Sequence, residues 1–256
     1  MLLGDSWLMG TIRSSAGDIS ILFEDDHLVV VVKPAGLPTA NAARGEESLY
    51  TVLKQRFGEG AFVGVVSRLD APVSGVVVFA KTPAAAAGLA EQFRDRSVEK
   101  AYSAVVTGRF PAPLGSWVDW HDAISRREGE PKSQLHPAAA ACDRGGDEAP
   151  RAAHLRARVV VRAGEVSLVE LEPSTGRRHQ LRLQLASRGC PIVGDRLYGS
   201  RLPCRSGGIA LHAQRLAFDH PATGAAMRFD SPCRAVWSAA FPSLFAGAAG
   251  PSVRGW

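Results

Sequence analysis

The first residue of this chain that could do chemistry is Asp70, in the stretch VSRLDAPVSGVVVFAKT. It stands just before an apolar, strand-like run, and Arg68 precedes it by two residues. Side chains two apart on an extended chain point the same way, so a guanidinium there would keep the Asp70 carboxylate ionised. An ionised carboxylate can act as a nucleophile, although a lone Asp–Arg pair is more often structural.

A basic cluster follows more than a hundred residues later, in the stretch STGRRHQLRLQLASRG. Its apolar spacing predicts a helix with Thr175 as its cap and Gly189 at its end. On that helix Arg178 and Arg182 would share a face. Arg177, Arg178 and the unpaired N–H groups of the first turn would make the helix start favourable for an anion.

Other catalytic and binding motifs are missing from the sequence. It has no GxGxxG after a strand and no GxxxxGK[ST], its histidines lack metal-ligand spacing, and its four cysteines form no CxxC pair. Ser74-Gly75 lacks the GxSxG frame of a nucleophile elbow. We therefore expect no cofactor and no metal, and we expect His179 to hydrogen-bond at the helix start rather than to act as a base.

The charge of the chain is unevenly distributed. The whole chain has a net charge of +5, whereas residues 151–215 hold twelve arginines and four acidic residues, a net charge of +8. Guanidinium groups pair with phosphate and stack on bases, so this segment favours a polyanionic partner. Codon bias in a GC-rich genome would also enrich arginine, and composition alone leaves both explanations open.

The elements that must position these residues can be read from apolar runs and turn residues. Periodicity predicts helices over residues 47–57 and from the Thr82-Pro83 cap onward. The expected strands are HLVVVV (27–32), GVVVFAKT (75–82), KAYSAVVTG (100–108), a hairpin turning at Ala163-Gly164, and short strands within residues 208–232. Residues 125–150 predict a surface loop or an ordered excursion.

This pattern favours one mixed α+β domain over residues 16–245, with terminal extensions at 1–15 and 246–256. No apolar run reaches the roughly 20 residues that cross a bilayer, and the N-terminus does not resemble a signal peptide. We therefore expect a cytoplasmic protein without a membrane partner, which the widely spaced cysteines fit.

The motifs described so far resemble a known family. SRLDAPVSGVVVFAKT resembles the HRLDxxTSGLLLLAKT signature of the RluA family of RNA pseudouridine synthases. STGRRHQLRLQLASRGCPIVGDRLYG is similar to that family's TGRTHQIRVHLAxxGxPIxGDxxYG, and HLVVVVKPAGLPT, EKAYSAVVTGRF and LHAQRLAFDHPATG fit in the same order. The resemblance runs from about residue 20 to about residue 235. It implies the pseudouridine synthase fold, a mixed, mainly antiparallel sheet with flanking helices, and a monomer that isomerises uridine in RNA without a cofactor.

The resemblance also implies roles for individual residues. Asp70 matches the catalytic aspartate, which attacks the ribose C1′ or abstracts the C2′ proton, and the sequence does not choose between these routes. Tyr102 matches the tyrosine that stacks on the base, and Leu181 would line the base pocket. Arg182 matches the basic residue that pairs with the catalytic carboxylate. Arg68 matches the arginine that enters the space left by the flipped nucleotide. From their charge and position at the helix start, and not from the resemblance, we expect Arg177 and Arg178 to bind the RNA.

The sequence departs from the family pattern next to Asp70. Ser67 replaces the usual histidine, and the residues after Asp70 are Ala71, Pro72 and Val73. Pro72 lacks an N–H and fixes φ, so the hydrogen bonds of this loop should differ. The N-terminus also lacks the pattern of an S4-type RNA-binding module.

Alternatives to an active synthase remain at this point. The departures leave open an RNA-binding protein of the same fold that no longer catalyses. A glycosidic-bond hydrolase would need a second carboxylate, and its one obvious candidate, Asp195, is structural in the family pattern. Ribosomal RNA and transfer RNA both remain open as substrates.

Overall fold

The computed structural model describes residues 10–43, 45–142 and 148–246 and divides the chain into two compact units. The first unit takes its residues from 1–99 and 213–231, and the second from 100–212 and 232–256. The single domain expected over residues 16–245 stays a prediction. Part of the expected N-terminal extension is an ordered strand, because the first strand begins at Gly10.

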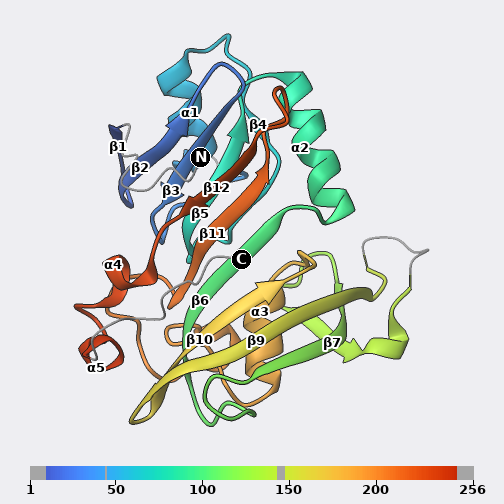
Figure 1. Cartoon of the computed structure of the whole chain (residues 1–256), viewed down its shortest axis with the longest axis vertical. Helices are drawn as coiled ribbons and strands as arrows, with labels where there is room; N and C mark the ends of the chain where they lie inside the picture. The colour runs from blue at the N-terminus through green and yellow to red at the C-terminus, as the bar shows by residue number, and fades with distance from the viewer. Residues whose placement is uncertain (1–9, 44, 143–147, 247–256) are drawn as a thin grey trace. The chain divides into compact units, whose positions relative to one another are not determined.

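The first unit is built on one sheet with the strand order β1-β2-β3-β5-β11, in which β4 pairs with β5 and β12 with β11 (Figure 1). The ladders that join β1, β2, β3 and β5 are antiparallel. The strands are β1 (Gly10–Ser14), β2 (Gly17–Glu24), β3 (Leu28–Lys33), β4 (Gly64–Val65), β5 (Ser74–Ala80), β11 (Leu211–Asp219, in this unit from Ala213 on) and β12 (Ala226–Asp230).

Strand β3 is apolar from Leu28 to Val32 because both of its faces are covered. Val29 and Val31 belong to the buried cluster that includes residues of α1 (Leu49–Phe57). Val30, on the opposite face, belongs to the cluster that includes residues of α2 (Pro83–Asp95). A strand buried on both faces is expected to be a continuous β-branched run, as HLVVVV is.

Both helices of the first unit begin at a capping residue, of which Thr82 was predicted and Ser48 was not. The Ser48 side chain accepts the N–H of Thr51, and the Thr51 hydroxyl accepts the N–H of Ser48, which together form a capping box. The hydroxyl of Thr82 accepts the N–H of Ala85, and Pro83 occupies the first turn of α2. Both predicted helices are therefore confirmed.

The second unit holds a five-stranded antiparallel sheet in the order β6-β10-β9-β7-β8, with α3 packed against β7 and β8 (Figure 1). The hairpin predicted at Ala163-Gly164 joins β9 to β10. Its elements are β6 (Glu99–Thr107, in this unit from Lys100 on), β7 (Trp117–Arg126), β8 (Ser133–Pro137), β9 (Arg151–Ala163), β10 (Val166–Pro173), α3 (Gln180–Ser187), α4 (Cys233–Trp237), α5 (Pro242–Phe245) and the short 3-10 turns η1 (Ala138–Ala140) and η2 (Arg196–Tyr198). The predicted class, α+β with a mainly antiparallel sheet, is confirmed.

One local prediction for the second unit needs correction, and one is made more specific. The helix expected from the Thr175 cap begins only at Gln180, because His179 adopts a left-handed conformation with φ of 56°. Within the predicted 125–150 excursion, residues 133–137 form a regular strand, β8, paired with β7. Among the described residues of both units, none of the helices is long and apolar enough to cross a membrane.

Candidate active site

The stretch that carries Asp70 is anchored to the first unit by its middle side chain. Leu69 packs against the apolar cluster of β2, β3, β5 and α1, whereas Arg68 on one side of it is exposed and Asp70 on the other is half-buried. The apolar anchor thus fixes the chain between two charged side chains. The arrangement gives Asp70 access to a solvent-borne substrate while its backbone is held.

Backbone hydrogen bonds hold the same stretch. The Thr39 hydroxyl donates to the Leu69 carbonyl at 2.8 Å and accepts the Leu69 N–H at 3.1 Å. The Val73 N–H donates to the Asp70 carbonyl at 3.0 Å and closes a turn that contains Pro72. Because the turn is closed by the amide after Pro72, the missing N–H of the proline does not break it.

A buried lysine also reaches this turn. Lys33, the last residue of β3, is 0% exposed, and its ammonium donates to the carbonyls of Pro34, Leu37 and Ala71 at 2.9, 2.7 and 3.1 Å. The Gly36 N–H donates to the same Ala71 carbonyl at 2.8 Å. Segment 33–39 therefore holds the Asp70 turn through hydrogen bonds to the backbone of Leu69 and Ala71.

The charge on Lys33 is weakened by its surroundings. Burial lowers the pKa of Lys33 to about 7, and the negative charge of Asp70 opposes this by raising it. Desolvation disfavours an ammonium ion, and a nearby carboxylate stabilises it. Lys33 and Asp70 are therefore electrostatically coupled within the first unit.

The start of β5 must be glycine for steric reasons. Gly75 has φ of 126°, and a Cβ built there would collide with the backbone of Ala213 on the neighbouring strand β11. Glycine at position 75, after the Asp70 turn, is therefore required by the close approach of two strands.

In the second unit, Arg182 lies on α3 in a buried ion pair. Its Nε and Nη2 donate to the two carboxylate oxygens of Asp195 at 2.7 and 2.9 Å, and the two side chains are 6% and 1% exposed. This two-point geometry fixes the plane of the guanidinium. It also engages both carboxylate oxygens of Asp195, which fits the structural role that the family pattern implies for this residue.

Tyr198 completes the surroundings of Arg182. The guanidinium carbon lies 5.1 Å from the centre of the Tyr198 ring. The Tyr198 hydroxyl accepts the N–H of Ser133 at 3.0 Å and lies 2.9 Å from Nδ1 of His179. Burial raises the pKa of Tyr198, so its hydroxyl stays neutral. His179 lies at the helix start and forms a hydrogen bond, as predicted, but its partner is Tyr198 and its ring makes no capping bond to the helix.

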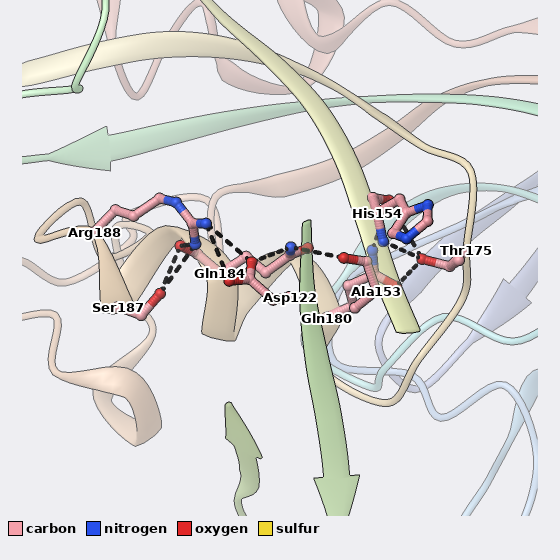
Figure 2. Close-up of polar contacts among 8 residues, drawn as sticks. All are labelled: Asp122, Ala153, His154, Thr175, Gln180, Gln184, Ser187 and Arg188. Carbon is pink, nitrogen blue, oxygen red and sulfur yellow. Dashed lines mark hydrogen bonds and ion pairs between the residues drawn. The ribbon is translucent and has the colours of Figure 1, made fainter. Parts of the chain in front are cut away.

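Polar contacts attach both ends of α3 to the sheet (Figure 2). At the start, Gln180 donates to the His154 carbonyl at 3.0 Å, and the Thr175 hydroxyl donates to Oε1 of Gln180 at 2.8 Å. Thr175, the predicted capping residue, thus bonds the side chain of Gln180, the first residue of the helix, and does not cap the helix itself.

The far end of α3 is held by a buried carboxylate on β7. Asp122 accepts from Nε2 of Gln184 at 2.6 Å and from Nη2 of Arg188 at 3.0 Å (Figure 2). Arg188 also stacks on Trp120, with 4.2 Å between the guanidinium carbon and the ring centre. These contacts fix the helix that carries Leu181 and Arg182.

The remaining predicted site residues of the second unit occupy different environments. Tyr102 is half-buried on β6, opposite Leu171 of β10, and Leu181 is buried at 7% exposure. Arg177 donates through Nε to the Ala152 carbonyl at 2.9 Å. Tyr102 and Leu181 therefore have fixed backbones, and Arg177 ties the segment before α3 to β9.

Arg178 does not share a helical face with Arg182, as its spacing suggested, because it precedes the left-handed residue His179. Its Nη1 donates to the Glu130 carbonyl at 3.1 Å, and its own carbonyl accepts the Ser133 hydroxyl at 3.0 Å. The 125–150 region therefore supports the segment before α3. Within the described residues, no three His, Cys, Asp or Glu side chains are grouped to hold a metal ion.

The comparison with protein families decides the identity. The model of the RNA pseudouridylate synthase family matches residues 27–187, which include every predicted site residue from Arg68 to Arg182. The chain belongs to the RNA pseudouridylate synthase family. It is an RNA pseudouridine synthase of the RluA type, as its motifs predicted.

Individual relatives agree with this family assignment. The RNA pseudouridine synthase YhcT of Bacillus subtilis (strain 168) is 35% identical over 84% of this chain and 69% of its own length. The dual-specificity RNA pseudouridine synthase RluA of Escherichia coli (strain K12) is 37% identical over 83% of this chain and 92% of its own length. The ribosomal large subunit pseudouridine synthase D of Pseudomonas aeruginosa is 35% identical over 84% of this chain and 68% of its own.

Solved structures of the family confirm the predicted fold. Human RNA pseudouridylate synthase domain containing 4 superposes with a TM-score of 0.66 at 25% identity and covers 88% of this chain and 92% of its own. Human RNA pseudouridylate synthase domain containing 1 gives a TM-score of 0.64 at 28% identity and covers 86% of each chain.

Sequence reasoning missed three contributors to this synthase's site. The sequence patterns assigned no role to Lys33, Thr39 or Tyr198. A signal existed for Lys33, because a lysine directly after five apolar residues of a doubly buried strand must itself be buried or bend away. Thr39 and Tyr198 act through contacts made far along the chain, which spacing does not reveal.

Proposed function

We propose that Asp70 starts the isomerisation of uridine to pseudouridine in RNA. The observation that carries the proposal is the placement of Asp70: a half-buried carboxylate on a turn held from both sides, next to an exposed arginine, in a chain of this family. A fixed carboxylate that solvent can reach suits a group that must meet a ribose.

The reaction needs only rearrangement of the uridine. Asp70 attacks the ribose C1′ or removes the C2′ proton, and the glycosidic bond to N1 breaks. The uracil then turns and C5 bonds to C1′. In the first route this breaks the bond between C1′ and the Asp70 carboxylate, and in the second the carboxyl group returns the proton to C2′. The C5 proton is then lost while N1 gains one. Product and substrate have the same atoms, so the chemistry requires no cofactor.

Arg68 would assist by replacing the uridine in its stack. Extruding a base costs a few kcal/mol in lost stacking and pairing. An exposed guanidinium adjacent in sequence to the anchored Leu69 can enter the vacated space and contact neighbouring phosphates. The exposure of Arg68 supports this role, because a side chain packed in the core could not move into the RNA.

The residues of the second unit receive the roles that the resemblance implies. We assign stacking on the uracil to Tyr102, lining of the base pocket to Leu181, and interaction with the catalytic carboxylate to Arg182. The ion pair with Asp195 supports the last role, because it presents the guanidinium in one orientation. For Arg177 and Arg178 we propose phosphate contacts.

The RNA that this enzyme modifies has two candidates. Ribosomal RNA and transfer RNA are both candidate substrates, and a monomer in the cytoplasm stays our prediction. Chemical labelling and sequencing of pseudouridines in total RNA from cells with and without this gene would test the proposal. Loss of modification at one or more uridines names the substrate. An unchanged map would instead favour the non-catalytic RNA-binding protein that Ser67 and Pro72 suggested.

A further inference from the structure

Lys33 is an unusual residue for its position. Lysine is almost never fully buried unless it is paired, yet Lys33 is 0% exposed at the end of a strand covered on both faces. Burying an ammonium ion costs much free energy, so a position that needed only to fill space would favour an apolar residue.

The partners of Lys33 come from two segments far apart in the sequence. An ammonium has three hydrogens, and three carbonyls accept them: two within segment 33–39 and one, that of Ala71, in the Asp70 turn. The bond to Ala71 spans 38 residues of sequence. Lys33 therefore joins the end of β3 to the residue directly after Asp70.

A neutral backbone donor already serves the Ala71 carbonyl. The Gly36 N–H bonds it at 2.8 Å, so satisfying this acceptor does not require a lysine. What Lys33 adds is positive charge below a turn that bears a carboxylate, and its pKa responds to the charge of Asp70. Within segments 34–39 and 69–73, Asp70 is the one titratable residue. The neighbouring strand β5 carries none, and β2, on the other side of β3, carries Asp18 and Glu24.

We propose that Lys33 is a positioning residue for the reaction: its buried ammonium clamps the turn at Ala71 and attracts the Asp70 carboxylate, which fixes the orientation of that carboxylate. This inference rests on the proposed function of Asp70. Lys33 is buried and acts through Asp70, so it is not itself a catalytic group.

The first test measures the coupling without using activity. Lysines labelled at 13Cε and 15Nζ would be followed by NMR through a pH titration of the wild-type protein and of Asp70→Asn, and five lysines make assignment practical. We expect Lys33 to titrate near pH 7 in the wild type and at lower pH in Asp70→Asn, because the carboxylate raises its pKa. Equal titration midpoints in the two proteins would overturn the proposal.

The second test asks whether the clamp serves the reaction. Lys33→Met should lower kcat by about 100-fold, as small displacements of a reacting group do, while KM for the RNA stays nearly unchanged. Hydrogen exchange should quicken at residues 69–73. Lys81→Met is the matched control, because Lys81 follows β5 at the opposite end of the same strand pair and bonds Glu24 at 3.1 Å.

The outcomes separate this inference from the proposed function. A wild-type protein that forms no pseudouridine would contradict the proposed function, and the titration and the hydrogen exchange would still decide whether Lys33 positions Asp70. A folded Lys33→Met variant with unchanged kcat would show that the lysine is merely structural. If Lys33→Met does not fold, the Asp70→Asn titration, which retains Lys33, decides.

Discussion

Arg182 and Asp195 form a two-point ion pair that is almost completely removed from solvent. Replacing Asp195 by alanine would leave the buried guanidinium without this carboxylate, and breaking a buried pair in this way typically costs about 3–5 kcal/mol. We therefore expect Asp195→Ala to lower the free energy of unfolding by that amount, measured by urea denaturation followed by circular dichroism.

The control for this prediction is an exposed ion pair. Asp230 accepts from Arg215 and Arg228 at 2.8 Å, and its side chain is 40% exposed. Because solvent screens such pairs, Asp230→Ala should cost less than about 1 kcal/mol. Equal losses in the two variants would show that the Arg182–Asp195 pair is no more important than a surface contact.

Stability should also depend on pH through Asp25. Burial raises the pKa of Asp25, but the N–H groups of Leu28 and His27 and the ring of His220 lower it more, so it ends below its usual value. The contribution of the ionised carboxylate is complete above the unfolded pKa of about 3.9 and is lost as pH falls through the lower folded pKa.

Asp25→Asn tests this assignment. Urea denaturation at a series of pH values should show that the wild type is the more stable protein at neutral pH. The difference between the two should shrink as the pH falls below about 4, where the carboxylate becomes protonated. Parallel stability curves across this range would contradict the role given to Asp25.

Gly75 should tolerate no side chain. Alanine at this position would combine an unfavourable positive φ with a collision against Ala213, so Gly75→Ala should cost about 2 kcal/mol or more. Gly224 also has a positive φ, of 71°, but open space around its Cβ position, and Gly224→Ala should cost about 1 kcal/mol. Equal urea midpoints for the two variants would exclude a steric requirement at Gly75.

The sequence was sufficient for those elements whose signals are local. The doubly buried run that became β3, the Thr82-Pro83 helix start and the hairpin at Ala163-Gly164 were all predicted, because each depends on neighbouring residues. The start of α3 was placed too early at Thr175. The Thr175 hydroxyl bonds the Gln180 side chain and accepts the N–H of His154 on β9 instead. Such tertiary contacts override a capping preference.

The candidate site shows the same division. The motif around Asp70 could be found by resemblance, and its departure at Pro72 was visible. The bonds that tie this stretch to segment 33–39, however, come from Thr39 and Gly36. The role of Lys33 could not be predicted from spacing, because its partner Ala71 lies 38 residues away. Contacts of this kind are set by tertiary structure, which spacing does not encode.

The most direct test of the account is pseudouridine formation by the purified wild-type protein and by Asp70→Asn on the RNA identified by mapping. We expect the variant to lose at least about 10³-fold in rate, because an amide is neither nucleophile nor base. Its affinity for RNA should stay within about threefold, since phosphate contacts supply most of it. Asp26→Asn, an exposed carboxylate in the first unit, should behave as the wild type. Pseudouridine formation by Asp70→Asn at the wild-type rate would contradict the account.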